Sequence, residues 1–176
     1  MVLPGGRFAK VKSPIDWLKN AGLIIKVKIS SSGEIPFSAF TVENRFKIYC
    51  FDIGILGALA EIPPKAIILE SDLFATFKGA FCENYVAQEF IASGSGQLYS
   101  WASNTSEVEF IREIEGSVYP VEVKSGKSGK LKSLNVFSGK YKTGRRIRID
   151  ARNLEFNTAA GMNSYPLYLA YRFPLS

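Results

Sequence analysis

Residues 118–125, V-Y-P-V-E-V-K-S, constrain the fold more than any other stretch of the chain. Valine and tyrosine residues alternate along it with Glu122 and Lys124. A period of two residues is typical of a β-strand with one buried face. We therefore predict a strand that hides its apolar face and presents a carboxylate and an ammonium group side by side on the other.

Residues 107–114 alternate in the same way and are joined to this strand by Glu115-Gly116, a typical two-residue hairpin turn. The register of such a hairpin places Glu109 opposite Glu122 and Glu107 opposite Lys124. The residues expected on the buried face are Val108, Phe110, Tyr119, Val121 and Val123.

Carboxylates that face each other across a hairpin repel, so a cation, a raised pKa or a bound metal must offset the repulsion. Magnesium and manganese ions bind carboxylate oxygens and water, and would suit Glu109 and Glu122. The alternative is a solvated face on which Glu107 and Lys124 form a cross-strand ion pair and the other carboxylates extend into water. The spacing leaves both interpretations open.

From residue 71 onward the predicted order is helix, three strands, helix, strand. The predicted helices span residues 72–91 and 130–141, and the predicted strands span 97–101, 107–114, 118–125 and 146–150, with a last strand at 167–171. The aromatic residues expected to face the core from the first of these helices are Phe74, Phe77, Phe81, Tyr85 and Phe90. Glu83 lies near the apolar side of this helix, as a half-buried hydrogen-bonding residue or as a site residue.

The 176 residues suffice for one sizeable core and contain no histidine. The absence of histidine excludes Ser-His-Asp and Cys-His catalysis and imidazole-bound zinc, so that any chemistry depends on carboxylates, lysines or tyrosines. No apolar run approaches the length of a membrane span, and Cys50 and Cys82 lack metal-binding spacing. We therefore expect a soluble, cytoplasmic protein.

Positive charge is concentrated directly downstream of the Glu-x-Lys strand. Residues 118–152 hold ten lysines and arginines against two acidic residues, a net charge of +8, whereas the remainder has a net charge of −2. Such a surface favours an anionic partner, with nucleic acid first. The expected phosphate contacts are Lys127, Lys130, Lys140, Lys142, Arg145, Arg146 and Arg148.

The constellation of Glu83, Glu109 and Glu122-x-Lys124 on this order of elements resembles the restriction-endonuclease-like PD-(D/E)XK phosphodiesterase superfamily. The resemblance implies an α/β fold with a central mixed sheet. It also implies that Glu109, Glu122 and the main-chain carbonyl of Val123 bind Mg or Mn. Lys124 would then orient or activate water, and Glu83 would complete the catalytic site.

A closer resemblance, to the C-terminal region of prokaryotic AAA-type ATPases, covers almost the whole chain. It rests on the phrases at residues 16–23, 45–49, 52–56, 78–86 and 107–111. It implies that residues 1–62 are a partial winged-helix-like segment, that residues 63–176 are the endonuclease-like domain, and that an ATPase domain adjoins them in a longer protein. That family usually has Glu-Val-Asp where this chain has Glu107-Val108-Glu109, and the longer glutamate can still reach a metal.

These observations together predict a nuclease-like, DNA-binding domain of a prokaryotic ATPase, with metal-dependent phosphodiester hydrolysis. The alternative is a non-catalytic module that keeps the endonuclease fold and binds nucleic acid or protein.

Overall fold

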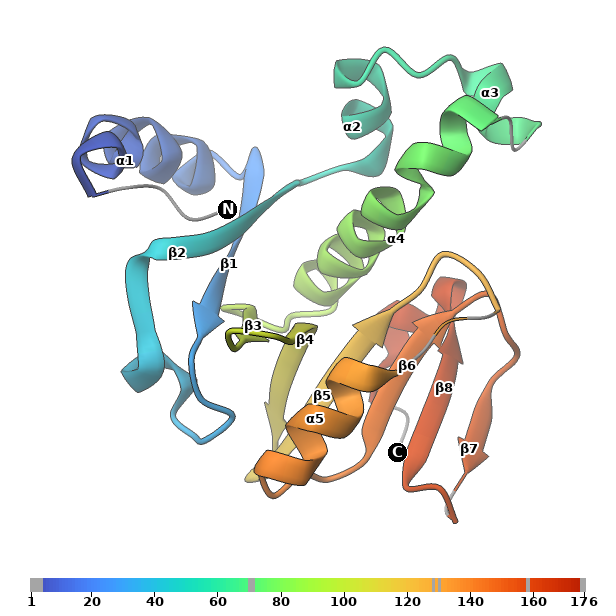
Figure 1. The fold of residues 1–176 in the computed structure, drawn as a ribbon. Helices are drawn as coiled ribbons and strands as arrows, with labels where there is room; N and C mark the ends of the chain where they lie inside the picture. The colour runs from blue at the N-terminus through green and yellow to red at the C-terminus, as the bar shows by residue number, and fades with distance from the viewer. Residues whose placement is uncertain (1–4, 70–71, 128, 130, 158, 175–176) are drawn as a thin grey trace.

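The computed structural model describes residues 5–69, 72–127, 129, 131–157 and 159–174. Within these residues, eight strands form one mixed sheet in the order β2-β1-β3-β4-β5-β6-β8-β7 (Figure 1). The strands are β1 Ile24–Ser30, β2 Thr41–Cys50, β3 Tyr99–Ala102, β4 Glu107–Ile114, β5 Ser117–Val123, β6 Arg146–Asp150, β7 Glu155–Asn157 and β8 Met162–Pro166. β1 pairs parallel with β3, and β6 pairs parallel with both β5 and β8, while the other pairs are antiparallel. The predicted α/β class with a mixed sheet is therefore confirmed.

The helices are α1 Gly5–Asn20, α2 Ile53–Leu59, α3 Pro64–Ile68, α4 Asp72–Ala92 and α5 Lys132–Lys140, with 3-10 turns at Phe37–Phe40 and Leu167–Arg172. Helices α4 and α5 cover opposite faces of the sheet. Phe110 and Ile111 are neighbours on β4, yet Phe110 is buried in a cluster with Val86 of α4, and Ile111 in a cluster with Leu134 of α5. Adjacent residues of a strand point to opposite faces, which places one core on each side of the sheet.

The hairpin of β4 and β5 has the predicted turn and register. Glu115 and Gly116 both have positive φ, at 50° and 76°. Phe110 pairs with Val121 and Ile114 with Ser117, which continues the register that places Glu109 opposite Glu122. The order helix, three strands, helix, strand from residue 72 to residue 150 is confirmed as well.

The prediction of a last strand at residues 167–171 was wrong. The last strand is β8, which ends at Pro166, and the apolar residues that follow it form a 3-10 turn. Leu167 and Ala170, three residues apart, both pack on the α4-side core, as the three-residue period of a 3-10 turn allows. The polar residues Asn163 and Ser164 of β8 are buried between neighbouring strands, so this strand has no alternating pattern.

Two further expectations differ from the structure. Phe77 is 39% exposed, whereas Phe74, Phe81 and Phe90 are buried as predicted. A helix is also present where the chain has Ser13-Pro14, a pair typical of a helix start, but helix α1 already begins at Gly5 and contains Pro14.

The sheet continues across residue 62, the predicted domain boundary. The hairpin of β1 and β2 is hydrogen-bonded to the rest of the sheet through Lys28, Ile29 and Ser30, which pair with residues of β3. The side chain of Asn84 on α4 also hydrogen-bonds both the main-chain nitrogen and the carbonyl oxygen of Cys50, at 2.7 and 2.9 Å. The N-terminal hairpin is therefore part of the framework that surrounds α4.

The conformation of the turn predicts the effect of replacing Gly116. Gly116→Ala is expected to lower the free energy of unfolding by about 1–2 kcal/mol, because an L-residue with a side chain is strained at positive φ. An added Cβ would meet no atom within 4 Å at Gly116 or at Gly139 of α5, where φ is not positive. Gly139→Ala is the matched control and should be neutral or stabilising, because alanine favours a helix interior. Urea denaturation of both variants checks this, and equal effects at the two positions would contradict it.

Candidate metal and nucleic-acid site

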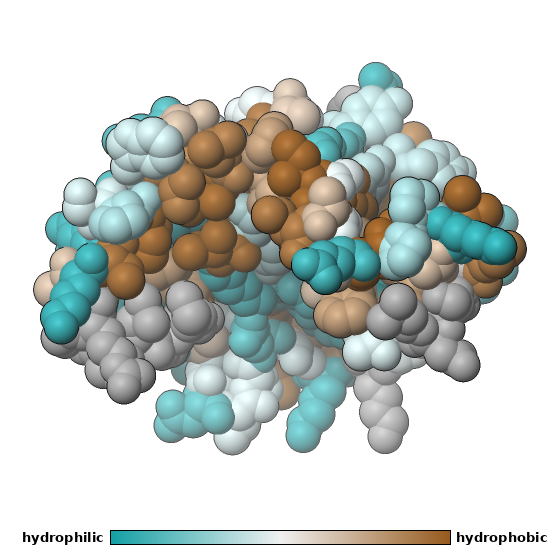
Figure 2. Space-filling view, turned by 90° about the horizontal axis from the view of Figure 1, so that it is seen from above, coloured by the Kyte–Doolittle hydropathy of each residue, from teal (hydrophilic) through white to brown (hydrophobic). Residues whose placement is uncertain are grey.

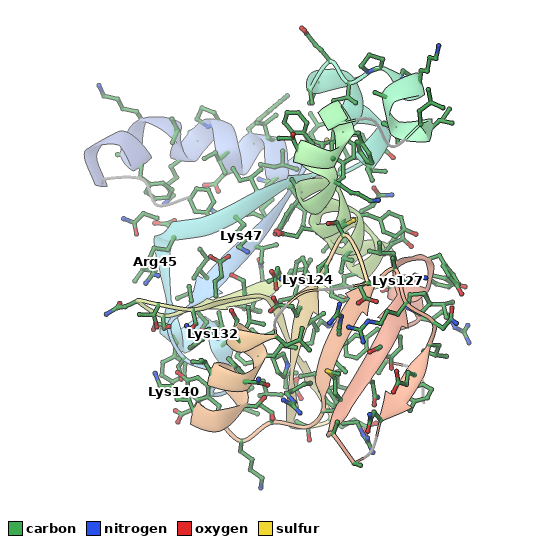
Figure 3. All side chains as sticks on the ribbon, turned by 45° about the vertical axis from the view of Figure 1, so that its right-hand side comes forward. Arg45, Lys47, Lys124, Lys127, Lys132 and Lys140 are labelled. Carbon is green, nitrogen blue, oxygen red and sulfur yellow. The ribbon has the colours of Figure 1, made fainter. Side chains whose placement is uncertain are left out.

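Three elements bring the candidate site residues together. Glu109 lies near the start of β4, Glu122 lies near the end of β5 with Lys124 directly after that strand, and Glu83 lies in the middle of α4. Figure 3 shows Lys124 near the centre of the molecule, with Lys127 on the loop that follows β5. The structure thus places all four predicted catalytic residues in one region.

An irregularity in β4 lies next to Glu109. Ile111 pairs with Tyr99 of β3, but Val108 pairs with Trp101, so the register shifts by one residue between the two pairs. Val108 consequently packs with Ile111 in the α5-side core, and the prediction that it shares a face with Phe110 was wrong. Such shifts redirect individual side chains, and here Glu109 lies within the shifted stretch.

Lys124 is paired with both carboxylates. Its Nζ lies 2.5 Å from Oε1 of Glu122 and 4.0 Å from Oε1 of Glu109. The side chains of Glu122 and Glu109 are only 4% and 14% exposed. The second oxygen of each carboxylate, Oε2, is buried without a hydrogen-bond partner among the described residues. Because buried polar atoms are nearly always satisfied, these two oxygens need a water or a cation as a partner.

Burial, followed by the negative charge of Glu122, raises the pKa of Glu109 to about 8. Burial alone would lower the pKa of Lys124, but its hydrogen bond to Glu122 and the neighbouring carboxylate charges outweigh burial and raise it. The raised pKa of Lys124 favours its charged form, and the raised pKa of Glu109 favours its protonated form.

Glu83 accepts a hydrogen bond at Oε2 from the hydroxyl of Tyr49 on β2, at 3.0 Å. Tyr49 of β2 was not identified from the sequence as a neighbour of the site. Arg45, Lys47 and Tyr49 alternate along this strand, and this alternation was the available signal. The alternation alone did not indicate where in the sheet the strand would lie, or which elements its side chains would contact.

Glu107 and Lys124, which the alternative interpretation paired with each other, have other partners. Glu107 pairs with Lys47 of β2, whereas Lys124 pairs with Glu122 and Glu109. The interpretation of a solvated acidic face is wrong for Glu109 and Glu122, because both side chains are largely buried.

The types of donor at this site, two carboxylates and a main-chain carbonyl, are those that magnesium and manganese prefer. Across the described part of the chain, no group of three or more His, Cys, Asp or Glu side chains is placed to hold a metal. Magnesium, however, usually keeps several waters and needs only one or two protein carboxylates. The buried Oε2 atoms of Glu109 and Glu122 supply two, and the carbonyl of Val123 remains the further predicted ligand.

Some of the predicted phosphate-binding residues are exposed, and others are buried or bonded within the protein. Lys127, Lys140 and Lys142 are exposed and Arg145 is partly exposed, while Lys130 lies outside the described residues. Lys132, exposed on α5, belongs with the exposed cations and was not predicted. Figure 3 labels Arg45 and Lys47 on β2, Lys124 and Lys127, and Lys132 and Lys140 on α5.

The prediction that Arg148 contacts phosphate was wrong. Its residue is 1% exposed, and its guanidinium pairs with the buried carboxylate of Asp150. The same guanidinium donates to the carbonyl oxygens of Lys127 at 3.0 Å and Gly129 at 3.5 Å. A buried charge must be paired, and Arg148 uses its charge to hold the loop after β5.

Arg146 is likewise engaged within the protein. Its guanidinium donates to Oδ1 of Asn135 at 2.5 Å and to the carbonyl oxygen of Ala160. Arg146 remains partly exposed. To bind phosphate as predicted, its guanidinium would have to donate to a phosphate oxygen as well as to Asn135 and Ala160.

Comparison with known families identifies residues 78–169, more than half of the chain, as a domain of unknown function, DUF4143. The chain therefore belongs to this family, whose match contains every predicted catalytic residue. No curated protein and no solved structure was found to match the chain. A search of the described helices for one both long and apolar enough to cross a bilayer found none.

The raised pKa of Glu109 predicts a fall in stability as pH rises. Between its ordinary value of 4.5 and about 8, the folded protein binds this proton and the unfolded chain does not. The stabilisation is therefore complete below 4.5 and is lost as pH rises through about 8, by at most about 1.4 kcal/mol per pH unit. Glu109→Gln should remove this contribution.

Urea denaturation between pH 5 and pH 9 measures the effect, with Glu155→Gln on the exposed strand β7 as the control. The wild type and the control should lose stability along the same curve, and Glu109→Gln should lose less. Parallel curves for all three proteins would contradict the assignment.

Proposed function

We propose that this chain is a nuclease-like, DNA-binding domain that uses the PD-(D/E)XK arrangement to hydrolyse phosphodiesters with magnesium or manganese. The observation that carries the proposal is the buried pair Glu109 and Glu122, each with an unpartnered Oε2, beside the ammonium group of Lys124. The resemblance to the restriction-endonuclease-like superfamily supports it. Its order of elements, helix, three strands, helix, strand, is present from α4 to β6.

Glu109, Glu122 and the carbonyl of Val123 would hold the ion. A bound ion of this kind supplies an activated water and neutralises charge on the phosphate. Lys124 contributes an ammonium group with three donors, of which Glu122 engages one at 2.5 Å. Its remaining donors can orient water or stabilise charge that develops on a phosphate oxygen.

The exposed cations would bind the DNA backbone. Lys127 lies three residues beyond Lys124, and its carbonyl oxygen is anchored by Arg148 and Arg152, at 3.0 and 2.9 Å. This anchoring holds the start of the basic loop next to the carboxylates. Contacts from Lys127, Lys140 and Lys142 to phosphates would give salt-sensitive affinity with little sequence preference.

We further propose that an ATPase domain adjoins this chain in cis and that residues 1–62 derive from a winged helix. The helix–strand–strand order of α1, β1 and β2 supports the second point. Leu59, Ile68 and Leu69 are 75%, 78% and 65% exposed. Figure 2, viewed toward the end that carries α1, α2 and α3, shows groups of apolar residues there. Exposed apolar patches are typical of protein interfaces, which suits a neighbouring domain.

The catalytic proposal predicts the behaviour of Lys124→Met. The wild type should cleave DNA in the presence of Mn²⁺, and Lys124→Met should be slower by roughly 100-fold or more, because it removes the charged group beside the reacting water. Single-turnover assays on duplex, branched and single-stranded DNA would measure this. Lys65→Met on α3 is the control and should retain wild-type activity. Equal cleavage by wild type and Lys124→Met, or no cleavage by either, would end the catalytic claim.

A second candidate function is a non-catalytic module that binds nucleic acid or protein. The observation that favours it is the short contact of Lys124 with Glu122. This ion pair, with a proton on Glu109, offsets the repulsion between Glu109 and Glu122 without a metal. In this case the fold would be kept for binding alone.

Calorimetry with Mn²⁺ separates the two candidates. The nuclease proposal predicts binding that Glu109→Gln and Glu122→Gln each weaken by about 10-fold or more, since each removes a charged ligand. Glu155→Gln should bind as the wild type does. Absent metal binding, together with DNA binding that weakens from low to physiological salt, would favour the module. DNA affinity that does not change with salt would exclude a phosphate-binding surface.

A further inference from the structure

Strand β2 presents alternate residues to the candidate site. Lys47 pairs with Glu107, and Tyr49 donates its hydroxyl to Glu83 at 3.0 Å. Phe46, the residue before Lys47, points to the other face and is buried in a separate cluster with Phe8 and Ile15 of α1. The odd-numbered face of β2 therefore contacts carboxylates on two elements of the site, β4 and α4.

The hydroxyl of Tyr49 lies among carboxylates. The residue is 8% exposed, and its ring packs against Phe110 with 5.9 Å between centroids. Burial raises the pKa of Tyr49, and the charges of Glu83, Glu109 and Glu107 raise it further. The phenol thus stays protonated and acts only as a hydrogen-bond donor toward Glu83.

Two adjacent pairs of residues fix this contact. Tyr49 binds Glu83, and the next residue on each element forms the second pair, in which Asn84 hydrogen-bonds both backbone groups of Cys50. A turn further along α4, Oε1 of Gln88 accepts a hydrogen bond from the main-chain nitrogen of Ile53 at 3.0 Å. The end of β2 is therefore held in register with α4, which leaves Tyr49 little freedom.

We propose that Tyr49 is a positioning residue of the site: its hydroxyl holds the carboxylate of Glu83 beside Glu109 and Lys124. Glu83 is close enough for its charge to act on both of these groups. Tyr49 engages one of its oxygens, Oε2, at 3.0 Å, which restricts the rotation of the carboxylate. Tyr49 lies outside residues 78–169 of the family match, and the N-terminal hairpin thereby completes the site.

The inference rests on the proposed metal site, and Tyr49→Phe tests it by removing one oxygen while keeping the ring. Mn²⁺ affinity should fall by about 10-fold, as is usual when a partner that orients a metal site is lost. In a Glu83→Ala background the same substitution should have no further effect, because the group that it orients is gone. Tyr168→Phe is the matched control, since Tyr168 is 68% exposed, and should leave affinity unchanged.

A second measurement needs no metal. NMR scalar couplings report the side-chain rotamers of Glu83 in the metal-free protein. The couplings should correspond to a single Glu83 rotamer in the wild type and in Tyr168→Phe. In Tyr49→Phe they should be averaged over several rotamers.

The outcomes separate the inference from the metal proposal. Wild-type Mn²⁺ binding that Tyr49→Phe leaves unchanged would overturn the inference and leave the metal site standing. If the wild type binds no Mn²⁺, the metal proposal fails and the rotamers decide: averaging of Glu83 in Tyr49→Phe alone supports the positioning role, and an unchanged rotamer overturns it.

Discussion

The repulsion between Glu109 and Glu122 is the interaction on which the surrounding structure depends. Both side chains are largely excluded from water, where two like charges would be costly without compensation. The protein compensates with the ammonium group of Lys124 and with a proton on Glu109. Neither compensation satisfies the second oxygen of each carboxylate. The proposed metal would satisfy these oxygens and take the place of the proton.

Much of this arrangement could be predicted from the sequence, because it depends on local rules. The turn at Glu115-Gly116 fixes the hairpin register, and the register sets Glu109 against Glu122 whatever the rest of the chain does. Glu83 could be placed because a long amphipathic helix limits which residues lie near its buried face. Tyr49 could not be placed, since its contact with Glu83 depends on β1 joining the sheet beside β3.

Other parts of the sequence were misleading for physical reasons. Strand β8 pairs with strands on both sides, and its buried Asn163 and Ser164 give no alternation to detect. Arg148 lies in a run of basic residues, yet the neighbouring strands bury it. Its guanidinium pairs with Asp150 and donates hydrogen bonds to the carbonyl oxygens of Lys127 and Gly129 in the loop. A count of positive charges therefore overstates the surface that can bind phosphate, because some of these cations serve as internal hydrogen-bond donors.

The parallel pairing of β1 with β3 has a consequence for how the protein folds. Lys28 pairs with Tyr99, roughly 70 residues later in the chain, after α2, α3 and α4. Pairings of such long range incur the loop-closure entropy of the whole intervening segment and tend to form slowly. The hairpin of β4 and β5, by contrast, closes over two residues. We therefore expect the two glutamates to meet early in folding, while Tyr49 reaches Glu83 only when the N-terminal hairpin docks.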